Sequence, residues 1–138
     1  MISTVTLVCI TSSVITADID DLQGHWVMVS SEVGQRAVSE ESIKASGFSF
    51  TIKGDQWIVA NPMNLNREIR STFKIDDTKE PKTLDRMSPD GKVTLSIYKL
   101  ENGTLTLCTY RDSRPTEFKT KVGDGVLAVY KLDKSKTP

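Results

Sequence analysis

Hydrophobic and polar residues alternate along most of this chain with a period of two, the spacing of a β-strand with one buried face. Phe48, Phe50 and Ile52, for example, alternate with polar residues. The alternation, together with β-branched and aromatic enrichment, predicts eight or nine short strands. The predicted segments are 26–31, 48–53, 56–60, 69–75, 82–87, 93–100, 104–110, 117–121 and 126–132.

Turn residues separate these segments. Asn102-Gly103 favours a tight hairpin between 93–100 and 104–110, because both residue types accept a positive φ. Gly123-Asp124-Gly125 is expected to join 117–121 to 126–132 as a last hairpin. One helix is expected at 39–45, where Ser39 is a candidate N-cap and two glutamates follow it in the first turn.

Many short strands at this spacing are typical of an all-β sandwich or barrel. The chain has 138 residues, which fits one domain with its own core.

The N-terminal segment 1–17 contains no charged residue, and it ends in Ala17 immediately before a cluster of aspartates. This pattern predicts a secretory signal peptide, a mature domain at 18–138, and a secreted, periplasmic or cell-envelope location. The alternative is an additional β-strand or an ordered arm. We expect no membrane span in the mature chain.

Charge and cysteine content narrow the function classes. Lysine plus arginine and aspartate plus glutamate are equal at 18 each, so the basic excess of a nucleic-acid binder is missing. Of the two cysteines, only Cys108 lies in the predicted mature domain, and its apolar surroundings favour a small buried residue over a nucleophile. We expect no metal and no cofactor.

The sequence offers little for catalysis. His25 is the only histidine, so a general base for a serine-type triad has a single candidate, which sits at the start of a strand. Adjacent carboxylates such as Asp76 and Asp77 would point to opposite faces of a strand. We therefore expect a protein that is not an enzyme.

A set of short motifs adds a family resemblance. The first strand carries Leu22-Gln23-Gly24-His25-Trp26, and the others are 73–76, 79–82, 97–100, 103–108 and 114–118. In this order they resemble an uncharacterised lipocalin-like domain family of planctomycete bacteria, over about residues 20–132. The chain departs from that family in having Thr104 after the hairpin glycine and Leu132 after Lys131.

The resemblance implies an exported, calycin-like, antiparallel up-and-down β-barrel of about eight strands with one short helix between the first two strands. It implies no activity. It also implies that Gly24 and Trp26 close the base of the barrel under a basic residue of the last strand. In this chain that residue would be Lys131.

Three functional hypotheses remain open. In the leading one, a monomeric barrel binds a small, mostly apolar ligand, with Trp57, Phe73, Tyr98 and Tyr110 as cavity candidates. In the second, the barrel is filled and the protein acts in the cell envelope through protein–protein contacts. In the third, a hydrolase or isomerase site uses His25 or a buried carboxylate in the cavity.

Overall fold

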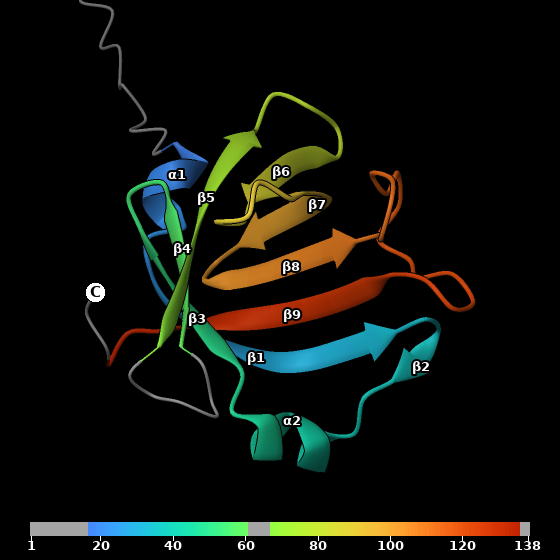
Figure 1. Ribbon diagram of the computed structural model, residues 1–138. Helices are drawn as coiled ribbons and strands as arrows, with labels where there is room; N and C mark the ends of the chain where they lie inside the picture. The colour runs from blue at the N-terminus through green and yellow to red at the C-terminus, as the bar shows by residue number, and fades with distance from the viewer. Residues whose placement is uncertain (1–16, 61–66, 136–138) are drawn as a thin grey trace, which may run out of the picture.

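A computed structural model describes residues 17–60 and 67–135 (Figure 1). The signal peptide predicted for 1–17 therefore lies outside the described residues, apart from Ala17.

The described residues form a closed antiparallel barrel of eight strands with one additional short strand. Each strand pairs with the next one along the barrel, and the last strand pairs back onto the first, so the sheet has no free edge there. The strands are β1 (Gly24–Val33), β2 (Arg36–Ala37), β3 (Ser49–Lys53), β4 (Gln56–Ala60), β5 (Glu68–Asp76), β6 (Lys82–Met87), β7 (Val93–Glu101), β8 (Thr104–Thr109) and β9 (Val126–Asp133). The expected fold class is confirmed.

In the described residues, two short helices, α1 and α2, accompany the barrel (Figure 1). The predicted helix is α2 (Glu40–Ser46), which packs against β1 through the buried Ile43. The Ser39 hydroxyl caps it by accepting the N–H of Ser42, and Gly47 ends it with φ 57°. The other helix, α1 (Asp18–Asp21), was not predicted.

Residues 117–121 do not form the predicted strand, and only Lys121 makes an isolated bridge to Asp124. Both edges of β9 are already paired, one with β8 and one with β1, so no edge is left for this segment. The connection between β8 and β9 instead folds over the outside of the barrel, where Phe118 packs on the buried Ile97 and Cys108. We call this second packing region the outer cluster.

The centre of the barrel is filled by a layer of aromatic rings. Phe50 and Trp57 stack with ring centroids 3.9 Å apart, and Tyr130 meets Phe50 edge-on at 4.8 Å. Phe73 contacts Trp57 edge-on at 6.1 Å. All four residues are buried, so this aromatic layer fills the middle of the barrel and separates its two ends.

Candidate ligand site in the open end of the barrel

The two ends of the barrel differ in how they are built. One end carries α1, and we call it the closed end (Figure 1). The other end carries the β1–β2 turn, the β6–β7 turn and the long β8–β9 connection, and we call it the open end.

Close packing seals the closed end. Trp26 has no exposed surface, and its Nε1–H donates a 2.8 Å hydrogen bond to the carbonyl oxygen of Leu22. Gly24 has φ 129°, and a Cβ atom at this position would lie 2.8 Å from a methyl carbon of Leu132. Glycine is therefore required here both for the backbone conformation and for the space.

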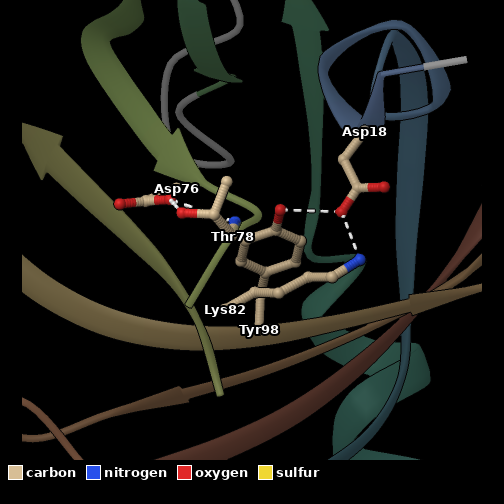
Figure 2. Close-up of polar contacts among 5 residues, drawn as sticks. All are labelled: Asp18, Asp76, Thr78, Lys82 and Tyr98. Atoms are coloured by element: carbon tan, nitrogen blue, oxygen red, sulfur yellow. Dashed lines mark hydrogen bonds and ion pairs between the residues drawn. The ribbon is translucent and has the colours of Figure 1, made fainter. Parts of the chain in front are cut away.

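A polar cluster completes the closed end (Figure 2). One carboxylate oxygen of Asp18 accepts hydrogen bonds from the Tyr98 hydroxyl and the Lys82 ammonium, both at 2.8 Å. Burial, and then the bond to Asp18, raises the pKa of Tyr98, and the same carboxylate raises the pKa of Lys82. These groups satisfy one another, so the cluster fastens α1 to the barrel rather than offering a binding site. Asp76 accepts from Thr78 nearby in a local turn.

Lys131 does not cover Trp26 as the family resemblance implied. It is exposed and lies opposite Val27, whereas the residue opposite Trp26 on β9 is Leu132. Neighbouring strand residues point to opposite faces, so Lys131 lies on the outer face of the sheet and Trp26 on the inner face.

The inner face changes character above the aromatic layer, toward the open end. Ser31, Ser71 and Ser96 are buried there, and the Ser96 and Thr109 hydroxyls are 2.8 Å apart. Thr94 follows on the same face of β7, two residues from Ser96. Small polar side chains leave space that large apolar ones would fill.

Arg86 is the charged residue of this region. It lies two residues after the buried Leu84 on β6, on the same face, and therefore points into the barrel, where its guanidinium carbon lies 5.3 Å from the centre of the Trp57 ring. Burial lowers the pKa of Arg86. Within residues 17–60 and 67–135, no carboxylate forms a salt bridge with Arg86. We call these inward-facing residues, Ser31, Ser71, Arg86, Thr94, Ser96 and Thr109, the upper interior.

Two further polar groups of the aromatic layer adjoin Arg86. Trp57 is only 1% exposed, and its indole Nε1–H is buried without a hydrogen-bond partner. Burial raises the pKa of Tyr130 to about 12, and the charge of Arg86 works against that rise. Buried donors without partners are costly, so native proteins usually satisfy them.

A cavity of about 590 Å³ occupies the open end. The inner-face residues Val33, Thr94, Thr109 and Val126 line it, and loop residues complete its rim. The charged rim residues are Arg36, Lys92, Arg111 and Asp124. Thr94 pairs directly with Arg86 across β6 and β7, so Arg86 lies one strand away from the cavity wall on the same face. The volume falls within the range of small-molecule sites.

The structure separates the four predicted cavity residues. Trp57, Phe73 and Tyr98 belong to the core inside the barrel, but Tyr98 lies at the closed end in the Asp18 cluster. Phe73 and Arg86 also border a second cavity of about 440 Å³. Tyr110 belongs to the outer cluster, its hydroxyl donates to the carbonyl of Lys119 at 2.6 Å, and it borders the open-end cavity from the loop side.

The residues considered for catalysis, His25 and Cys108, lie outside the upper interior. The Nδ1 atom of His25 is 3.0 Å from the hydroxyl of Thr51, and both residues alternate with core residues, which places them on the outer face. Cys108 is buried in the outer cluster, where burial raises the pKa of its thiol. In the part of the chain that the structure describes, no group of three or more His, Cys, Asp or Glu side chains could hold a metal ion.

Arg86, the central polar residue of the upper interior, was not singled out by the sequence analysis. The signal was present, because Lys82, Leu84 and Arg86 share one face of the predicted strand 82–87. An arginine on the same face as an apolar residue of a barrel strand is unusual enough to mark a functional candidate.

Comparisons with known proteins identify no relative: no family model matches the chain, and neither the curated proteins nor the solved structures contain a match. Over residues 17–60 and 67–135, no helix has the length and apolar character needed to cross a bilayer.

Proposed function

We propose that this protein is a non-catalytic binding protein that holds one small, mostly apolar molecule in the open end of its barrel. The observation that carries the proposal is the 590 Å³ cavity at the open end, whose inner-face lining includes Val33 and Val126. The loop residues at the rim of this cavity belong to the open end, so a ligand would enter and leave there.

The charge pattern, the uncharged segment 1–17 and the motif order support the rest of the proposal. In this view the chain is an exported, monomeric member of the lipocalin-like family that its motifs resemble. Removal of 1–17 would leave a domain that begins with α1 at the closed end, away from the ligand.

Binding of N-phenyl-1-naphthylamine, a neutral apolar fluorophore, to the full chain tests this function. We expect saturable fluorescence enhancement with one site per chain. The variant Val126→Trp should weaken binding at least tenfold, because it places a bulky ring on the cavity wall. The matched control is Val129→Trp on the outer face of the same strand, which should bind like the natural chain.

The absence of saturable binding would overturn the proposal. Equal binding by the natural chain and Val126→Trp would do the same, because the probe would then sit outside this cavity. In that case the filled-barrel alternative, an envelope protein that acts through its outer surface, would take precedence.

A further inference from the structure

We propose that the ligand carries a single small anionic group, such as a carboxylate, and that Arg86 and the Nε1–H of Trp57 bind this group at the inner limit of the site. The inference rests on the proposed function and specifies the chemical class of its ligand. It starts from two donors that the described structure leaves without an acceptor.

The first donor is the guanidinium of Arg86. It points into the barrel, and its carbon atom lies 5.3 Å from the centre of the Trp57 ring, over the ring face. A cation taken out of water costs free energy unless an anion compensates it, and in the described residues no carboxylate does so. Lys82, the other inward-facing basic residue of β6, differs from Arg86 because it has a carboxylate partner: Asp18 lies 2.8 Å from its ammonium nitrogen.

The second donor is the Nε1–H of Trp57, which is buried and unpaired in the same region. Trp26, at the closed end, again provides the contrast, since its Nε1–H is bonded to Leu22. The other polar side chains of the upper interior are Ser31, Ser71, Ser96, Thr94 and Thr109, all small. A group that accepts hydrogen bonds and brings a negative charge would satisfy both donors.

The rim of the cavity favours the same sign of charge. Three basic residues, Arg36, Lys92 and Arg111, line it together with one carboxylate, Asp124. An excess of positive charge around a concave site raises the association rate of anions. An arginine fork also matches the planar geometry of a carboxylate.

The arrangement orients the ligand. The anionic group would lie beside Arg86, just above the aromatic layer, and the apolar part would extend toward Val33 and Val126 at the open end. Val122, which is 84% exposed on the rim, would contact the outer part of a longer molecule. The preferred ligand is therefore an amphiphile with one charged end rather than a neutral hydrocarbon.

Displacement of N-phenyl-1-naphthylamine from the full chain by decanoate and by 1-decanol tests the inference. The two competitors share a chain length and differ in charge. We expect decanoate to displace the probe at a concentration at least tenfold lower than decanol. In Arg86→Met this advantage should disappear, so that decanoate and decanol displace the probe at similar concentrations.

Three further variants identify the donors. Arg86→Lys keeps the charge without the fork and should retain part of the preference for decanoate. Trp57→Phe keeps a ring without the Nε1–H and should weaken decanoate about threefold to tenfold relative to decanol. Arg36→Gln changes only a rim charge, and its effect should be below threefold and should vanish in high salt.

The outcomes separate the two proposals. If the probe binds but decanoate and decanol compete equally, or if Arg86→Met keeps the decanoate preference, the anionic group is wrong and the binding function stands. If the probe itself does not bind, the proposed function fails first. Urea unfolding of each variant checks its fold, and Arg86→Met should be no less stable than the natural chain, because it removes an uncompensated buried charge.

Discussion

The two ends of the barrel contain similar residue types, but they differ in whether the buried polar groups have partners. The closed end contains a buried tryptophan, a tyrosine and an inward-facing lysine, and each polar group among them has a partner: Trp26 with Leu22, and Tyr98 and Lys82 with Asp18. In the aromatic layer the Nε1–H of Trp57 has no hydrogen-bond partner, and just above the layer Arg86 has no salt bridge among the described residues.

This difference teaches how to distinguish a structural polar cluster from a binding site. Satisfied polar groups inside a protein fix one packing arrangement and contribute to stability. Unsatisfied ones reduce stability and persist where function requires them. Perturbing the closed end should therefore change unfolding, and perturbing the upper interior should change binding.

The largest expected effect is at Trp26. The variant Trp26→Ala should lower the free energy of unfolding by about 3–5 kcal/mol, because it empties the sealed base of the barrel. Urea denaturation followed by far-ultraviolet circular dichroism measures this loss. The control Val126→Ala at the open end, where the side chain is already 38% exposed, should lose less than about 1 kcal/mol. Similar losses in both variants would contradict the distinction between the ends.

A smaller effect is expected from the Asp18 cluster. Asp18→Ala leaves the Tyr98 hydroxyl buried without its acceptor, and we expect a loss of about 1–3 kcal/mol in the free energy of unfolding. Tyr98→Phe removes the hydroxyl without leaving it unpaired, and Lys82 keeps Asp18, so its loss should be smaller, about 0.5–1.5 kcal/mol. The double variant should resemble Tyr98→Phe. A loss in Asp18→Ala no greater than in Tyr98→Phe would show that the cluster does not fasten α1.

The smallest effect is a pH dependence that reports on Tyr130. Its pKa is raised by burial to about 12, above the value near 10 of an unfolded chain. The protonated form is therefore favoured by folding. The stabilisation that the protonated Tyr130 hydroxyl gives the fold is fully present below pH 10 and is lost as the pH rises toward 12. The free energy of unfolding should fall by about 1 kcal/mol between pH 10 and 11.

Urea unfolding at several pH values between 9 and 11 measures this slope. Tyr130→Phe should reduce it, and Tyr98→Phe should reduce it too, because burial and the bond to Asp18 also raise the pKa of that tyrosine. A slope unchanged in both variants would mean that neither hydroxyl is held protonated by the fold.

Local signals predicted most of the elements. Alternation located eight of the barrel segments, and the Asn102-Gly103 turn joins β7 to β8 as expected. The Ser39 cap predicted α2. The hairpin predicted from 117–121 and the Gly123-Asp124-Gly125 turn was wrong, because a strand also needs a free neighbouring edge and β9 had none.

The candidate site was less predictable than the fold. Aromatic content suggested Trp57, Phe73, Tyr98 and Tyr110 as one group, yet they lie in the central layer, at the closed end and in the outer cluster. Composition cannot assign a residue to one of these places, since each of them buries an aromatic ring equally well.

The sequence by itself determined the eight barrel strands, the Asn102-Gly103 turn and the helix cap, because these depend on neighbouring residues and on backbone preferences. Only the tertiary structure decided which face of each strand lies inside, that β9 closes onto β1, that Lys131 faces outward and that Arg86 faces inward. The physical reason is that a period of two defines two faces but does not name the inner one. The pairing of strands that are distant in the chain decides which face lies inside, and it does so for all eight barrel strands together.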